Sequence, residues 1–212
     1  MKKRLFCILI VLFLPALCIA ADPRIETIGP FQGNAPENVK AALSETGYRV
    51  LGDDGKVLAE IWPAKIVVTE KNESSSAIYP DFVDGAFYGL ISLPSGTTDL
   101  RGQNIPTGTY TMRYQLLPGD GNHMGVAPDP DFFLLLPADL DPGPTNRMTF
   151  QSLVRASAKA SGTAHPAAFA LASPDARGVA AKQESGHTIA YFPIGSGSVK
   201  VPIGMILSGA AE

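Results

Sequence analysis

The sequence predicts a mainly β protein, either an antiparallel β-sandwich or a partly open barrel, with two short helices. Glycine and proline together make up 39 of 212 residues, which exceeds average usage and indicates many turns. Several short segments alternate between apolar and polar residues, as strands with one buried face do. Since no internal repeat and no break in composition divides the chain, we expect one β-rich domain over residues 21–212.

The first 20 residues have the three-part pattern of a secretory signal peptide. Three basic residues at positions 2–4 precede the apolar run Leu5–Leu14, which is shorter than the roughly 20 residues of a membrane-spanning helix. We therefore expect cleavage after residue 20 or 21 and a periplasmic or extracellular location. Lipid anchoring at Cys18 is the alternative.

The expected mature chain has no cysteine, because Cys7 and Cys18 both lie in the signal peptide. Its stability must then come from burial rather than from disulfides. Removal of the three basic residues leaves 14 basic and 20 acidic residues, a formal charge of −6. This charge argues against nucleic acid and anionic membranes as partners. No second apolar run has the length of a transmembrane segment.

The first expected helix is Asn34–Thr46. Asn34 can cap it, Glu37 completes a capping box, and Gly47 can end it. Its apolar face is expected to pack against a sheet.

A β-hairpin is expected next, with strands Tyr48–Leu51 and Lys56–Trp62. The connection Gly-Asp-Asp-Gly has the composition of a hairpin loop, with Gly55 in a left-handed conformation. A short β-branched strand, Ile66–Thr69, follows, and then a polar loop over Glu70–Pro80.

The segment Phe82–Leu93 returns to a β pattern. Gly85 and Gly89 within it indicate a bulge or a close approach of two backbones. Pro94–Gly108 is expected to be a long loop that leads into the centre of the fold.

The central unit is a pair of strands. Thr109–Leu116 alternates, with Tyr110, Met112, Tyr114 and Leu116 on one face, which predicts a half-buried strand. Phe132–Leu136 is apolar at every position, which fits a central strand covered on both faces, and Pro137 helps to end it.

The residues I-P-x-G-T-Y-T-x-R-Y at positions 105–114 resemble a strand of secreted β-sandwiches of the carboxypeptidase-regulatory-like and transthyretin-like type. In those domains a Pro-Gly turn precedes a strand that contains tyrosine. The wider stretch is similar to uncharacterised secreted bacterial β-sandwich proteins. The resemblance implies a fold neighbourhood and no particular activity.

A second helix is expected over Thr149–Ser161, with Phe150, Leu153, Val154 and Ala158 on one stripe and Gly162 at its end. Three closing strands are then expected. They are Ala167–Leu171, Thr188–Ile194 and Ser198–Leu207, in which Pro202 limits pairing.

Candidate binding residues gather in the loop Pro118–Pro130 and at its edge. Rigid scaffolds commonly present binding sites on loops, although the same residue types also form ordinary surface turns. Outside this loop, Trp62 beside Glu60 could form a sugar-stacking platform or be a core residue. The predicted binding residues are Glu60, Trp62, Arg113, Asp120, Asn122, His123, Asp129, Asp131 and His165.

The sequence carries no catalytic signature. It has no G-x-S-x-G elbow, no phosphate-binding loop and no dinucleotide fingerprint. The three histidines, at positions 123, 165 and 187, are widely spaced and form no ligand motif.

Two hypotheses about function follow. The first is a secreted, non-catalytic binding protein without a cofactor, whose loops hold a ligand, a glycan or an envelope partner. The alternative is a metal-dependent enzyme, such as a hydrolase, with a divalent metal held by His123, His165 and the loop aspartates.

Overall fold

A computed structural model describes residues 22–71, 76–118, 127, 129–176 and 178–208 of the chain. Its main feature is a ten-stranded antiparallel sheet, with the order β1-β2-β3-β4-β7-β8-β9-β12-β11-β10. The ten strands are β1 (Arg24–Ile28), β2 (Gly47–Leu51), β3 (Val57–Pro63), β4 (Phe87–Leu93), β7 (Gly108–Leu116), β8 (Asp131–Pro137), β9 (Ala168–Ala172), β10 (Ala180–Glu184), β11 (His187–Ser196) and β12 (Val199–Ser208). The prediction of a mainly antiparallel β fold is confirmed.

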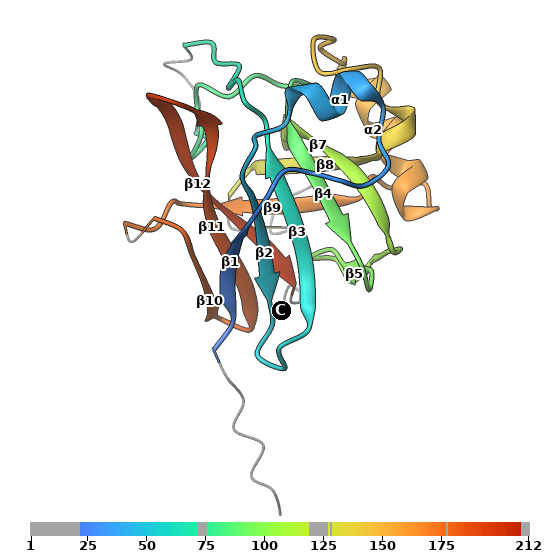
Figure 1. Cartoon of the computed structure of the whole chain (residues 1–212). Helices are drawn as coiled ribbons and strands as arrows, with labels where there is room; N and C mark the ends of the chain where they lie inside the picture. The colour runs from blue at the N-terminus through green and yellow to red at the C-terminus, as the bar shows by residue number, and fades with distance from the viewer. Residues whose placement is uncertain (1–21, 72–75, 119–126, 128, 177, 209–212) are drawn as a thin grey trace, which may run out of the picture.

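The sheet curls until its two ends come together. β1 and β10, which stand at opposite ends of the strand order, lie beside each other (Figure 1). The rings of Tyr48 on β2 and Phe192 on β11 are 5.7 Å apart although their strands are not neighbours in the sheet. The architecture is therefore a nearly closed barrel.

Smaller elements pack around this sheet. They are the helices α1 (Glu37–Ala42) and α2 (Phe150–Ser161), a 3-10 turn (Ala138–Leu140), and a two-stranded ribbon of β5 (Thr97–Thr98) and β6 (Asn104–Ile105). Figure 1 shows both α-helices at the same end of the molecule. Among the described residues, no helix has the length and apolar character needed to cross a membrane.

Strand β8 is buried on both faces, as the apolar run predicts. Phe133 and Leu135 point into the interior, where they face Tyr114 and Met112 of β7. Phe132, Leu134 and Leu136 point outward into a second apolar cluster that includes α2. Burial of both faces explains why this strand shows no alternation.

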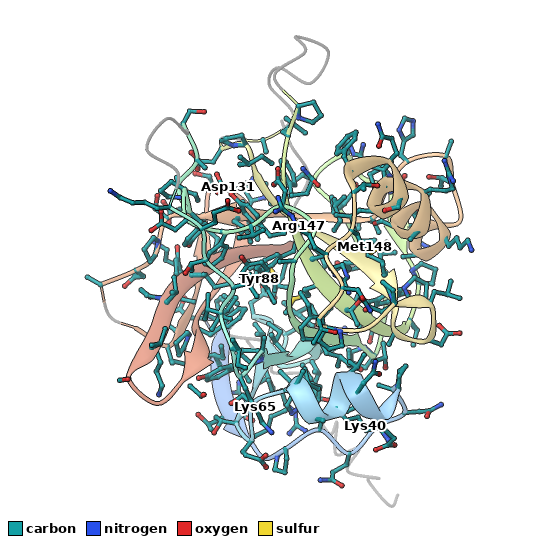
Figure 2. The ribbon with its side chains drawn as sticks, turned by 90° about the horizontal axis from the view of Figure 1, so that it is seen from above. Lys40, Lys65, Tyr88, Asp131, Arg147 and Met148 are labelled. Carbon is teal, nitrogen blue, oxygen red and sulfur yellow. The ribbon has the colours of Figure 1, made fainter. Side chains whose placement is uncertain are left out.

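Aromatic rings fill part of the interior. The rings of Phe82 and Tyr88 stack with centroids 4.4 Å apart, and Tyr88 also stacks on Phe133 at 5.8 Å. Figure 2 shows Tyr88 near the middle of the molecule. Burial raises the pKa of the Tyr88 hydroxyl well above its ordinary value, so this group stays protonated as it donates to the Val68 carbonyl oxygen.

Two prolines face each other in the hairpin of β11 and β12. Pro193 and Pro202 are register partners. The amide of Gly204 donates to the Tyr79 hydroxyl oxygen and therefore points away from β11. Residues two apart on a strand turn their amides to the same side, so the nitrogen of Pro202 also points away from β11, toward the outer edge of β12. Neither proline therefore removes a hydrogen bond between β11 and β12. The prediction that Pro202 limits pairing is wrong for this pair of strands.

The first helix is shorter than predicted. α1 begins after Pro36, has no side-chain cap, and ends before Leu43, which is extended. Leu43 makes an isolated β-bridge with Ala64, and this pairing turns the chain out of the helix. Gly47 belongs instead to β2, where a Cβ atom would lie 2.4 Å from Nε1 of Trp62.

The second helix is confirmed at both ends. The Thr149 side chain accepts a hydrogen bond from the Ser152 amide, and Gly162 follows in a left-handed conformation with φ of 67°. Its buried face differs from the predicted stripe, because the buried residues are Leu153, Ser157, Ala160 and Ser161. Small side chains let this helix approach the sheet closely.

The other strand predictions are confirmed only in part by the structure. The predicted hairpin, its left-handed Gly55 and the bulge near Gly89 are present. Ile66–Thr69 does not form a strand, since Ile66 is 77% exposed and the segment contributes an isolated bridge at Thr69. The sequence analysis missed β1 and β10, as well as the β5–β6 ribbon inside the predicted long loop.

Candidate functional site

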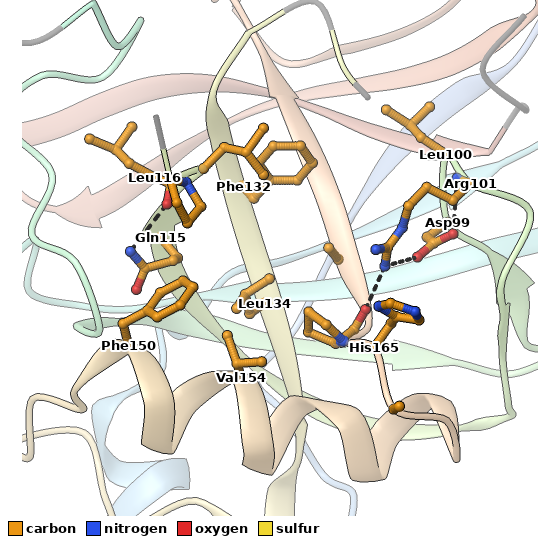
Figure 3. A pocket seen from close by; sticks show the side chains of 15 residues that line it. Asp99, Leu100, Arg101, Gln115, Leu116, Phe132, Leu134, Phe150, Val154 and His165 are labelled. Atoms are coloured by element: carbon orange, nitrogen blue, oxygen red, sulfur yellow. Dashed lines mark hydrogen bonds and ion pairs between the residues drawn. The ribbon is translucent and has the colours of Figure 1, made fainter. Parts of the chain in front are cut away.

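A pocket of about 190 Å³ lies on the outer face of β7 and β8. Its floor is apolar, with Phe132 and Leu134 of β8, and α2 forms one wall with Phe150 and Val154. Figure 3 shows Gln115 at one end of the pocket and His165 with Arg101 at the other. The pocket therefore combines an apolar centre with polar ends.

The floor exists because β8 carries large apolar side chains on both faces. The outward-facing Phe132 and Leu134 are 6% and 5% exposed. α2 packs over β8, and Leu153 of this helix is fully buried. Phe150, at the first turn of the helix, is 41% exposed and stands at the pocket wall.

The far wall is a turn built on the buried carboxylate of Asp99, which is 2% exposed. Its Oδ1 accepts hydrogen bonds from the amides of Arg101 (3.0 Å) and Gln103 (2.9 Å). The Arg101 guanidinium binds both Asp99 Oδ2 (3.0 Å) and the Pro166 carbonyl oxygen (2.9 Å). These bonds fix the turn to the connection between α2 and β9.

Gln115 supplies a polar group without a partner. It is 8% exposed, and its Nε2 donates to the Leu116 carbonyl oxygen at 3.2 Å. Its Oε1 is buried and accepts no hydrogen bond in the described structure. A buried polar atom without a partner costs free energy and calls for an explanation.

The charges at the pocket are compensated. Arg101 is paired with Asp99, and His165 is an exposed residue at the rim. The apolar floor, with its few polar groups at the ends, suits the binding of an apolar group.

Arg113, a predicted binding residue, is instead fully buried beneath the chain that follows β8. Its Nε and Nη2 bind the Asp141 carboxylate at 2.8 and 2.6 Å. The remaining bonds go to the carbonyl oxygens of Gly85, Gly143 and Asn146. Because the guanidinium is enclosed, it serves structure, and strand β7 is covered on both faces rather than half-buried.

Asp141 is ionised within this network. Burial would raise the pKa of its carboxyl group, but the hydrogen bonds and charge of Arg113 outweigh burial and lower it below the ordinary value. Thr111 Oγ1 donates to Asp141 as well, at 2.6 Å.

Asp131 also serves structure. Its carboxylate is fully buried and accepts hydrogen bonds from the Tyr114 hydroxyl (2.6 Å) and the amides of Ile78 and Tyr79 (both 3.0 Å). These bonds hold the segment around Tyr79 against the end of the barrel. Asp129 is half-buried two residues earlier and lines none of the pockets described.

Trp62 and Glu60 lie on β3, away from the pocket. The Trp62 ring is 6% exposed, packs edge-on against Phe31, and donates from Nε1 to the Gly29 carbonyl oxygen at 2.9 Å. The ring is therefore enclosed and not open to a sugar. Glu60 forms an ion pair with Arg49 of the neighbouring strand.

Asp120, Asn122 and His123 lie outside the described residues. Within the described ranges, no three His, Cys, Asp or Glu side chains come together as metal ligands would. Of the predicted binding residues, His165 alone among those described lines the pocket.

Sequence reasoning missed Gln115, Arg101 and Phe132 as pocket residues. Gln115 lies on the polar face of an alternating strand, where a solvent-exposed residue is expected. Phe132 belongs to an apolar run, which predicts a core residue. The sequence contained one signal, since Phe132–Leu136 is apolar on both faces and its outer face must be covered by another element. The exposed Phe150 shows that α2 covers this face of the strand incompletely.

No family model, no curated protein and no solved structure matches this chain. The resemblance of residues 105–114 to secreted β-sandwiches stays a prediction.

Proposed function

We propose that this protein is an exported, non-catalytic binding protein that holds an apolar group of its ligand or partner in the pocket between α2 and β8. The observation that carries the proposal is the unpartnered Gln115 Oε1 in the wall of an open apolar pocket. An apolar site with few, well-placed polar groups is the usual form of a small-molecule site.

The enclosed position of Trp62 removes the residue that was expected to stack on a glycan. A small ligand, or a single side chain of an envelope partner, fits the pocket better than an extended sugar chain. The Arg113 and Asp99 networks fix the strands and the turn around it, so the backbone of the site is already in place before a ligand binds.

The test is to fill the pocket. Val154→Trp places a large ring in the cavity, and Val179→Trp is the matched control, because Val179 is 43% exposed and lines no part of the pocket. Binding of a mixture of small apolar probes is followed by NMR, through shifts of the Val154 methyl and His165 ring signals in wild type.

The expected result is saturable binding to the wild type and to Val179→Trp, with loss of at least tenfold in affinity for Val154→Trp. Both variants are first compared with wild type by thermal unfolding. Absence of binding to the wild type at millimolar probe concentration would contradict the proposal.

A further inference from the structure

We infer that the group held in this pocket is a single aromatic ring that carries one neutral hydrogen-bond donor, as a phenol does. This inference rests on the proposed binding function and specifies its ligand chemistry. Four observations bear on it: the size of the pocket, the unpartnered acceptor, the balance of charge at the rim, and the rings in the wall.

The pocket is small. Its volume of about 190 Å³ is below the range of about 300–1,000 Å³ that is usual for drug-sized ligands. A protein cavity of about 150 Å³ is large enough for benzene. One six-membered ring with one or two small substituents therefore fills it, whereas a nucleotide, a disaccharide or a fused polycyclic ligand would extend out of it.

The ligand must donate a hydrogen bond. Gln115 Nε2 is engaged by the Leu116 carbonyl oxygen, so the free group is the carbonyl Oε1, which only accepts. In Figure 3 this oxygen is turned toward the ring of Phe150. A ligand reaches it when Phe150 turns aside, and Phe150 is 41% exposed, so solvent lies on one side of its ring.

The ligand is neutral. The guanidinium of Arg101, which would attract a carboxylate, is already paired with Asp99 Oδ2 and the Pro166 carbonyl oxygen. Asp99 is 2% exposed and is occupied by backbone amides as well. Because Asp99 balances the charge of Arg101, an anionic ligand would find little net attraction, and a cationic ligand would find no open carboxylate among the described residues of the pocket wall.

The ring is aromatic. Phe132 in the floor and Phe150 in the wall both line the pocket. Aromatic pairs in offset or edge-to-face contact gain free energy beyond that of the buried area, so a flat ring is favoured over a saturated one of the same size.

The experiment measures dissociation constants by NMR titration for four matched probes: p-cresol, toluene, 4-methylcyclohexanol and benzoate. We expect p-cresol to bind about five- to tenfold more tightly than toluene, because it satisfies Gln115 Oε1. We expect a preference of about threefold over 4-methylcyclohexanol, and weaker binding of benzoate.

The variant Gln115→Leu removes the acceptor and keeps a side chain of similar size. It is expected to bind toluene as well as the wild type does and to lose the preference for p-cresol. Phe150→Ala opens the way to Gln115 but removes one of the two rings, so it is expected to keep the preference for p-cresol over toluene and to lose most of the preference for p-cresol over 4-methylcyclohexanol.

The outcomes separate this inference from the function on which it rests. Equal binding of toluene and p-cresol, or tighter binding of benzoate or of 4-methylcyclohexanol, overturns the inference and leaves an apolar binding site. Absence of binding by all four probes overturns both. Comparison of p-cresol with the peptide Gly-Tyr-Gly identifies the source of the phenol: tighter peptide binding assigns a tyrosine side chain, and tighter p-cresol binding assigns a free small molecule.

Discussion

Arg113 and Gln115 lie two residues apart on the same outer face of β7, yet their polar groups have opposite surroundings. Five hydrogen bonds engage Arg113, and it is fully enclosed. Gln115 is nearly as buried but leaves its Oε1 without a partner beside the pocket. The difference arises because the chain after β8 brings the Asp141 carboxylate and the Asn146 carbonyl oxygen to Arg113, whereas at Gln115 it brings the apolar ring of Phe150.

This contrast shows that a polar residue on a strand face takes its role from segments far away in the sequence. Asp141 is 28 residues from Arg113 along the chain, and it decides that Arg113 is structural. Three measurements test this difference between Arg113 and Gln115.

The largest effect is expected from Arg113→Met. This variant leaves the Asp141 carboxylate buried without its ion pair, and loss of one partner of a buried pair costs about 3–5 kcal/mol. Urea unfolding should show a corresponding drop in the free energy of unfolding. A loss of less than about 1 kcal/mol would mean that the network is not structural; Arg49→Met, on a partly exposed pair with Glu60, is the control.

A smaller effect is expected on acidification. The pKa of Asp141 is lowered in the folded state, so its contribution to stability is complete above the unfolded pKa of about 3.9 and is lost as the pH falls through the folded value. The free energy of unfolding should therefore decline below about pH 4 more steeply in wild type than in Asp141→Asn. Parallel declines of the two proteins would show that Asp141 does not carry this dependence.

The smallest effect is expected from Gln115→Leu. This change removes an unsatisfied acceptor together with one hydrogen bond of 3.2 Å, so the free energy of unfolding should stay level or rise by up to about 1 kcal/mol. Thermal unfolding without ligand measures it. A loss of more than about 2 kcal/mol would show that Gln115 serves structure as Arg113 does.

The sequence predicted well what depends on local pattern. Phe132–Leu136 is apolar throughout and is a strand buried on both faces. Thr149 and Gly162 bound a helix because a cap and a left-handed glycine act locally. Both features depend on residues close together in the chain.

The sequence predicted poorly what depends on distant partners. β10 has a composition with little preference for strands and exists through its pairing with β11. Ile66–Thr69 has the β-branched composition of a strand, yet it forms none. The pocket was missed for the same reason, since the Asp99 turn, α2 and β8 meet only in the folded chain.

The facing prolines of β11 and β12 have a consequence for how copies of this chain meet. Pro202 turns a nitrogen without hydrogen toward the outer edge of its strand, and Pro193 lies beyond the end of its register with β10. At these two positions a strand from a neighbouring molecule would find no N–H donor with which to pair. The two prolines therefore disfavour pairing between strands of different copies at this point of the β11–β12 hairpin.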